Sequence, residues 1–155
     1  MDVRGKTALV TGAARRVGRA IALSLSAEGA RLAIHYNHSR KEALALVREI
    51  ERSHRVEARA FKADLARPAE VERLAARVRR AMGPVRVLVN NASNYSRIPF
   101  GDISLRDWER NMAVNLRAPF LLAQALGPAM RKAGGGKIIN IADWAALRPY
   151  AGYIP

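Results

Sequence analysis

The segment TGAARRVG, residues 11–18, combines residue types that can bind a phosphate group. Gly12 and Gly18 would permit a tight turn and a close approach of the backbone to a ligand. A helix that begins here would add free peptide N–H groups and the positive end of its dipole. Arg16 stands where a dinucleotide-binding turn usually has a glycine. The segment indicates a pyrophosphate site, although an ordinary strand-to-helix loop would also explain the two glycines.

A second polar segment, residues 36–40, follows the next apolar run along the chain. Proteins that prefer NAD place an Asp or Glu near this point, where it bonds the ribose 2′-hydroxyl. This segment contains no acid and offers neutral or basic donors instead: Tyr36, Asn37, His38 and Ser39. Together with Arg15 and Arg16, these residues favour the 2′-phosphate of NADP(H) over NAD. Ser39 can also cap the following helix, and the two roles are compatible.

Further candidate residues follow the third and the fourth apolar runs. Asp64 and Leu65 come after the third run, and Asn91, Ala92 and Ser93 come after the fourth. Each of these positions can contact a ligand held at the ends of the runs.

For two polar residues, Asp143 and Asn115, we expect apolar surroundings. Asp143 follows the fifth run, and there it is either a structural hydrogen-bonding group or a poised acid, because desolvation raises a carboxyl pKa. Asn115 lies in an otherwise apolar helical stretch. A buried Asn needs partners, so Asn115 is either structural or part of a site.

The apolar runs that carry these residues are rich in β-formers and short enough to be strands. They predict strands over residues 7–11, 31–36, 56–61, 86–89 and 137–142. Segments with helical spacing lie between them. The resulting alternation predicts an α/β fold in which a parallel sheet has helices on both faces and its strands are buried. Ligands of such sheets bind beyond the carboxyl ends of the strands.

Local signals mark where the helices begin and end. Val17, Ile21 and Leu25 share one face of the first predicted helix, and Gly29 ends it. Residues 39–42 and 104–107 have the form of capping boxes. The remaining predicted helices run from Pro68 to Met82 and from Ser104 to about Lys132.

Composition sets the class of protein. The 155 residues are enough for one domain, 50% are hydrophobic and 26% are charged, which is typical of a globular protein. Cysteine is absent, so disulfide and thiolate chemistry are excluded. No apolar run approaches the length of a membrane span, and the first residues lack a signal-peptide pattern, so we expect a cytoplasmic protein with no membrane partner.

The formal net charge of +14 raises the possibility of nucleic-acid binding. The basic residues are scattered over the polar faces of the predicted helices, however. Only 6% of residues are aromatic, which is too few for a stacking platform. We therefore expect no nucleic-acid partner, and we predict no metal site.

Taken together, these residues resemble the short-chain dehydrogenase/reductase family. The resemblance rests on the turn from Gly12 to Gly18, on Asp64, on residues 90–92 and on Asn115, in this order along the whole chain. It implies a doubly wound Rossmann-type sheet with strand order 3-2-1-4-5 and hydride transfer with a nicotinamide cofactor. It also implies that Asn91 lines the cofactor site and that Asn115 holds a water in a proton relay.

Within the family the chain is most similar to pteridine reductases, whose turn has the form TGxxxRxG. This resemblance implies that Arg16 lies over the cofactor phosphates and the substrate edge and that Tyr95 stacks on a pterin. It also implies that Asp143 gives a proton to a ring nitrogen, where most of the family has a serine. Residues 34–39 are similar to the segment that binds the 2′-phosphate in pteridine reductases, although the arginine usual in that segment is replaced by His38. The expected activity is NADPH-dependent reduction of C=N bonds in a pteridine or dihydrofolate-like substrate.

One departure concerns the family's catalytic Tyr-x-x-x-Lys, which has no match in this sequence. Tyr150 and Tyr153 have no lysine four residues on, and by spacing the tyrosine would follow Pro155 directly. Residues 1–155 therefore look like the amino-terminal NADP-binding domain of a longer chain. We expect this part to be inactive alone. We expect the full-length protein to be a homo-oligomer, and the tetramer is typical of the family. A 3-oxoacyl or other ketone reductase and a non-catalytic nucleotide-binding module remain as alternatives.

Overall fold

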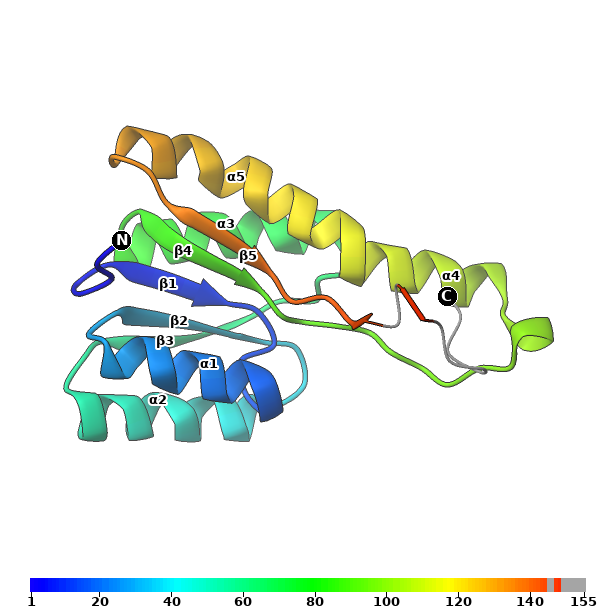
Figure 1. Cartoon of the computed structure of the whole chain (residues 1–155), viewed down its shortest axis with the longest axis horizontal. Helices are drawn as coiled ribbons and strands as arrows, with labels where there is room; N and C mark the ends of the chain where they lie inside the picture. Colours follow the sequence, from blue (N-terminus) through cyan, green and yellow to red (C-terminus); the bar gives the residue numbers. More distant parts are fainter. Residues whose placement is uncertain (145–146, 149–155) are drawn as a thin grey trace.

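The chain folds as a five-stranded parallel sheet between two layers of helices (Figure 1). The structure is a computed structural model that describes residues 1–144, 147 and 148. The strands lie in the order β3-β2-β1-β4-β5, which confirms the predicted fold class and strand order. Their bounds are β1 (Thr7–Val10), β2 (Arg31–Tyr36), β3 (Ala58–Lys62), β4 (Val85–Asn90) and β5 (Lys137–Asn140).

Helices α1 (Arg16–Ala27) and α2 (Arg40–His54) cover one face of the sheet, and α3 (Pro68–Met82) and α5 (Ala118–Lys132) cover the other. The side chains of β1 show how the two cores are separated. Leu9 packs with α3 and α5, whereas Ala8 and Val10 pack with α1 and α2. Successive residues of a strand point to opposite faces, so one strand contributes to both cores.

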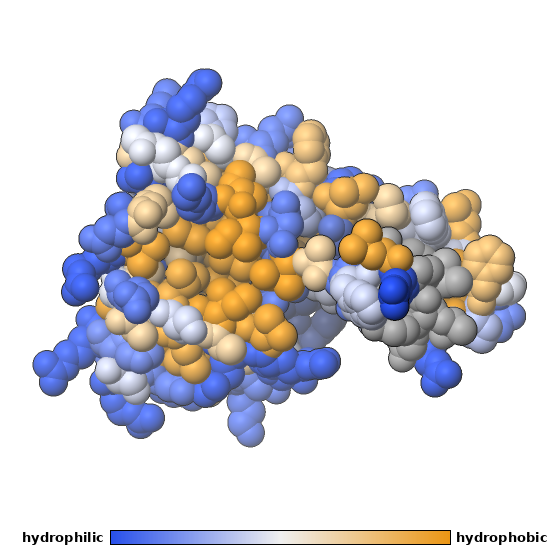
Figure 2. All heavy atoms as spheres, viewed as in Figure 1, coloured by the Kyte–Doolittle hydropathy of each residue, from blue (hydrophilic) through white to orange (hydrophobic). Residues whose placement is uncertain are grey.

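The expectation that all strands are buried is wrong for β5. Each of its four residues is exposed, and Ile138 and Ile139 retain 42% and 44% of their accessible surface. Among the described strands β5 pairs only with β4, so it forms an edge of the sheet. Figure 2 shows that apolar side chains gather over the strands on this side of the molecule.

Four of the predicted strands have other bounds in the structure. β1 ends at Val10 rather than at residue 11, and β4 runs over Val85–Asn90 rather than over 86–89. β3 begins at Ala58 and ends at Lys62, and β5 ends at Asn140 rather than at residue 142. The limits of both strands follow their neighbours, because Leu32 pairs with Ala58 and Asn90 pairs with Asn140. Pairing partners in the sheet, and not the length of the apolar run, set where these strands begin and end.

The two predicted capping boxes differ in outcome. Ser104 has an extended backbone with ψ 158°, and its hydroxyl accepts the N–H of Asp107, whose carboxylate bonds the N–H of Ser104 in return. The box that starts α4 (Leu105–Met112) is therefore confirmed. The box at Ser39 is wrong. Ser39 has ψ 57°, and its side chain makes no capping hydrogen bond. A cap needs the extended backbone to aim the hydroxyl at the first turn.

The long helix predicted from Ser104 to Lys132 is interrupted. A π-helical segment, η2 (Ala113–Arg117), lies between α4 and α5, and a short 3₁₀ turn, η1 (Phe100–Asp102), precedes α4. π-turns of this kind widen a helix by one residue and often occur at functional sites. Asn115 lies at the centre of η2.

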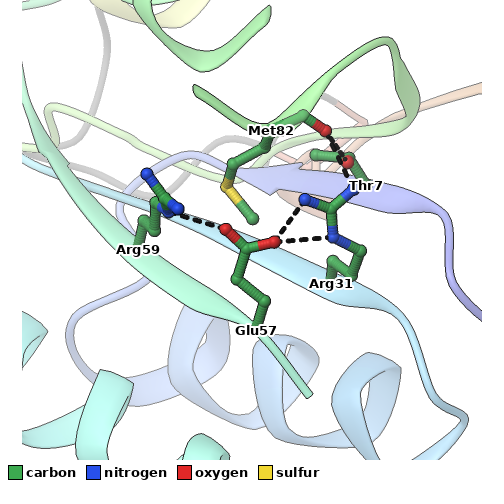
Figure 3. A network of polar contacts seen from close by, with 5 residues as sticks. All are labelled: Thr7, Arg31, Glu57, Arg59 and Met82. Carbon is green, nitrogen blue, oxygen red and sulfur yellow. Dashed lines mark hydrogen bonds and ion pairs between the residues drawn. The ribbon is translucent and has the colours of Figure 1, made fainter. Parts of the chain in front are cut away.

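A polar network joins the amino-terminal ends of three strands, β1, β2 and β3, to the end of α3 (Figure 3). Arg31 and Arg59 both bond the carboxylate of Glu57. The Met82 carbonyl, at the last residue of α3, accepts from the Arg31 guanidinium at 3.1 Å and from the Thr7 hydroxyl at 2.7 Å. The network satisfies a carbonyl that the end of a helix would leave without a partner.

Candidate functional site

The predicted site residues lie where the strands end, at the carboxyl-terminal end of the sheet, which is called the cofactor edge below. All five strands are parallel, so the segments that follow them emerge on the same side of the molecule (Figure 1). The turn before α1, the residues after β2 and β3, and the segments after β4 and β5 meet there.

The turn between β1 and α1 needs its two glycines. Gly12 has a left-handed backbone with φ 62°, and a Cβ on it would lie 2.9 Å from the Ala92 Cα. A Cβ on Gly18 would lie 2.5 Å from the side-chain nitrogen of Asn91 and 2.5 Å from the Gly12 carbonyl oxygen. The tight turn predicted at Gly12 is present, and the structure shows in addition that the turn packs directly against the segment after β4.

Arg16 takes the conformation that a glycine would take. Its φ of 51° is left-handed, which costs a non-glycine residue about 1–2 kcal/mol. It is the first residue of α1, it is exposed, and its guanidinium has no hydrogen-bond or ion-pair partner among the residues that the structure describes. Arg15 and Val17 beside it are also exposed. A long cation is thus held in a strained conformation at the amino end of a helix, and such strain is typical of functional sites.

Thr11 closes the turn against β4. Its hydroxyl accepts the N–H of Asn91 at 2.9 Å and the N–H of Ala92 at 3.0 Å. The Asn91 amide donates to the Thr11 carbonyl at 2.9 Å. Asn91 and Ala92 were predicted, whereas Thr11 was not assigned a role. The signal was available, because a buried hydroxyl at the end of an apolar strand needs partners.

His35 in β2 is the second residue that the sequence reasoning missed. Its side chain is buried, its Nδ1 accepts the N–H of Gly12 at 3.0 Å, and its Nε2 lies 3.1 Å from the Ala63 carbonyl. Because a carbonyl can only accept, Nε2 carries the proton. Desolvation lowers the pKa of His35 to about 4, although the Ala63 hydrogen bond and the charge of Asp64 act in the opposite direction. The imidazole is therefore neutral at physiological pH.

The segments after β2 and β3 border the same edge. Tyr36 is buried, Asn37 and Ser39 are half-buried, and His38 is exposed. Leu65 is buried, and Asp64 is half-buried. Asp64 accepts the N–H of Ala66 at 3.0 Å, and its own N–H donates to Glu70 at 2.7 Å, so it shapes the turn into α3.

The segment after β4 is clamped to the π-helical turn. The Asn115 side chain accepts the N–H of Asn94 at 2.9 Å and donates to the Asn94 carbonyl at 2.9 Å, and Asn111 donates to the same carbonyl at 3.2 Å. Asn115 has the partners that we expected, but it is exposed rather than buried, because the π-turn directs it to this segment. A cavity of about 250 Å³ lies beside the clamp, lined by Asn94, Ser96, Ile98, Asp107, Arg110 and Asn111.

The residues assigned to a substrate come from three segments of this edge. Arg16 begins α1, Tyr95 follows β4 and is 50% exposed, and Asp143 follows β5. The expectation of an apolar setting for Asp143 is wrong. Asp143 is exposed in the described part of the chain, where the strand before it pairs with β4 alone. Ser93 is exposed as well, and Tyr150 and Tyr153 lie outside the described residues.

The part of the chain that the structure describes contains neither a metal-binding cluster nor a membrane-spanning helix. No group of three or more His, Cys, Asp or Glu side chains in residues 1–144, 147 and 148 could hold a metal ion. No helix in that part of the chain has the length and apolar character needed to cross a membrane.

The sequence profile of short chain dehydrogenases matches residues 6–155, so the chain belongs to the short-chain dehydrogenase family. It is 41% identical to D-threitol dehydrogenase of Mycolicibacterium smegmatis over 92% of this chain and 54% of that protein. It is 38% identical to the 3-oxoacyl-acyl-carrier-protein reductase of Staphylococcus epidermidis over 88% of this chain and 55% of that protein. The chain thus spans about half the length of these curated relatives.

Among solved structures, a blue fluorescent protein from a metagenomic library in complex with NADPH is similar to the chain. The two superimpose with a TM-score of 0.89 at 41% identity, over 99% of this chain and 62% of that one. The predicted family membership is confirmed, and the cofactor of this structure agrees with the predicted NADP(H).

Proposed function

We propose that this chain forms the NADP(H)-binding part of a short-chain oxidoreductase. The observation that carries the proposal is the strained Arg16 at the start of α1, beside a turn that Thr11 and Asn91 hold against β4. The turn fits the group, because Gly12 and Gly18 let it pack closely against the segment after β4, and this turn leads to the amino end of α1 and its free N–H groups. A bound nicotinamide cofactor would supply the hydride.

Different residues around the turn would contact different parts of the cofactor. The N–H groups at the start of α1 and the Arg16 guanidinium would hold the pyrophosphate. Arg15, His38 and Ser39 would hold the 2′-phosphate, since no acid follows β2. Further contacts would come from residues at the same edge, namely Val17, Tyr36, Asn37, Asp64, Leu65, Asn91, Ala92 and Ser93.

Titration of the full-length protein with NADPH and NADH tests this assignment. Each charge-assisted hydrogen bond to the 2′-phosphate is worth about 1.5–3 kcal/mol, so we expect NADPH to bind at least about ten-fold more tightly. Arg15→Gln should reduce the preference, whereas Arg79→Gln on the remote end of α3 should leave it unchanged. Equal affinity for the two cofactors would refute the assignment.

For the substrate, we infer a pteridine or dihydrofolate-like compound that is reduced at a C=N bond. Arg16, Tyr95 and Asp143 support this inference, because a cation, an aromatic ring and a carboxyl group suit a flat heterocycle with oxo and imino edges. Asp143 would hold the proton for a ring nitrogen, and Asn115 would help to order a water of the proton relay.

A ketone or 3-oxoacyl reductase is the second candidate, and the identities to a sugar-alcohol dehydrogenase and a 3-oxoacyl reductase favour it. Asp143→Ser in the full-length protein separates the two. A pteridine reductase should lose about 10²–10⁴ in turnover with unchanged NADPH binding, since an acid–base group is lost. A ketone reductase should retain or gain activity. Dihydrobiopterin, dihydrofolate and a 3-oxoacyl thioester should be assayed side by side.

We further propose that the proton donor and the lysine of the family motif lie in sequence beyond Pro155. Residues 1–155 alone should then show no turnover above background, and the full-length protein should be a cytoplasmic homo-oligomer, a tetramer by family habit. A full-length protein that binds NADPH but turns over none of the three substrates would favour a non-catalytic nucleotide-binding module instead.

A further inference from the structure

His35 joins three segments of the cofactor edge that are far apart in the sequence. Its Nδ1 bonds the N–H of Gly12 in the turn after β1, and its Nε2 bonds the carbonyl of Ala63 at the end of β3. Its own carbonyl accepts the N–H of Ala13 at 3.0 Å. His35, which is only 2% exposed, therefore accepts two successive peptide N–H groups of the turn, one with its imidazole and one with its backbone carbonyl.

The two partners admit only one form of the imidazole. The Gly12 N–H needs an acceptor at Nδ1, and the Ala63 carbonyl needs a donor at Nε2, so the ring is the neutral Nε2–H tautomer. A protonated ring would direct a second N–H at Gly12. Asp64 beyond β3 is the charged side chain that acts on the ring, while Lys62 of β3 and Arg15 and Arg16 of the turn are exposed.

The turn has little else to fix the direction of this N–H group. Gly12 has the conformational freedom of a residue without Cβ, and its backbone sits at φ 62° against Ala92. The Asn91 amide donates to the carbonyls of Thr11 and Gly12, and the Thr11 hydroxyl accepts the N–H of Asn91. Neither Thr11 nor Asn91 accepts the Gly12 N–H. Without the imidazole, a donor that points at the buried side chain of β2 has no acceptor, and the turn must rearrange to find one.

We propose that His35 is a positioning residue of the cofactor site, whose neutral imidazole fixes the Gly12 peptide and thereby the turn that leads to Arg16 and Gly18. His35 touches no ligand in this arrangement and acts through Gly12. The inference rests on the proposed function, since it assumes that the turn binds NADP(H).

Three variants of the full-length protein test the role of Nδ1. His35→Asn keeps an acceptor in place, because the Asn Oδ1 and the His Nδ1 are both bonded to Cγ. His35→Gln can donate to Ala63 but leaves no acceptor for Gly12. His54→Asn is the matched control, since His54 bonds Ser26 between α1 and α2, away from the turn. We expect Kd for NADPH to rise about ten-fold or more in His35→Gln, and to stay within about three-fold of wild type in the other two. The KM for NADPH should rise in His35→Gln with little change in kcat.

A spectroscopic measurement on the wild type makes the test independent of variant folding. The ¹⁵N resonances of His35 should report the Nε2–H tautomer, and the Nδ1 resonance should shift when NADPH binds, while His54 stays unchanged. Equal losses in His35→Asn and His35→Gln would overturn the inference, because ring packing and not the Gly12 bond would then matter. An unshifted Nδ1 at saturating NADPH would overturn it as well. A wild type that binds no NADPH would instead overturn the proposed function, and the inference with it.

Discussion

Replacement of Gly18 by alanine adds one methyl group at the most crowded point of the site. The new Cβ would lie 2.5 Å from the Asn91 side-chain nitrogen and 2.5 Å from the Gly12 carbonyl oxygen. Ordinary van der Waals contact begins at 3.4 Å, so each neighbour must move by nearly 1 Å. One of the two is backbone of the turn, which cannot rotate away as a side chain can.

The expected cost follows from three contributions. Overpacking at a closely packed position costs about 1–3 kcal/mol. Displacement of Asn91 weakens its bonds to the Thr11 and Gly12 carbonyls, worth about 0.5–1.5 kcal/mol each. Alanine in a helix recovers about 0.5–1 kcal/mol relative to glycine. The net expectation is a loss of about 3 kcal/mol in the free energy of unfolding, together with weaker binding of NADPH.

Urea unfolding followed by circular dichroism measures this change. Gly101→Ala is the control, because Gly101 lies in η1 with nothing within 4 Å of its Cβ position, and its stability should stay within about 0.5 kcal/mol of wild type. The reasoning would be refuted if Gly18→Ala were as stable as Gly101→Ala and bound NADPH like the wild type.

Three further predictions concern stability. The pKa of His35 falls from 6.5 in the unfolded chain to about 4 in the fold, so the fold favours the neutral ring. The free energy of unfolding should therefore drop by about 3 kcal/mol as the pH falls from 6.5 to 4. In His35→Asn the free energy of unfolding should lack this part of its pH dependence, which acid unfolding curves measure. The hydrogen bond from Arg31 lowers the pKa of Glu57. The ionised Glu57 therefore contributes fully to the free energy of unfolding above pH 4.5, and this contribution is lost as the pH falls through the lowered pKa. Glu57→Gln should be less stable than wild type at pH 7 but not at pH 2. Ser104→Ala should cost about 1 kcal/mol in thermal unfolding because it removes a cap, whereas Ser39→Ala should change stability by less than about 0.5 kcal/mol.

Local patterns in the sequence were enough to predict the fold. Strand and helix periods are properties of neighbouring residues, and the parallel order of the sheet follows from their alternation together with the family resemblance. The positions of Gly12 and Gly18 were also predictable, because a tight turn and a close approach of chains each require a residue without Cβ.

Burial was predicted less well wherever it depends on distant elements. The sequence predicted apolar surroundings for Asp143 and for the strand of residues 137–142, yet among the described residues both Asp143 and β5 are exposed, and β5 pairs there with β4 alone. Asn115 reads as a buried polar residue, yet a π-turn directs it to Asn94 at the surface. A run of apolar residues shows that a segment is hydrophobic, but it does not show which other elements cover that segment.

The sequence by itself determined the order of strands and helices, the glycine turn and the lack of an acid after β2, since each depends on residues close together in the chain. Only the tertiary structure decided that Arg16 is left-handed, that Thr11 closes the turn against β4, and that His35 holds Gly12 and Ala63. Gly12 and Ala63 lie 23 and 28 positions from His35. The parallel pairing of β1 with β2 and of β2 with β3 brings these segments to one edge, and a hydrogen bond depends on that distance in space rather than on separation along the chain.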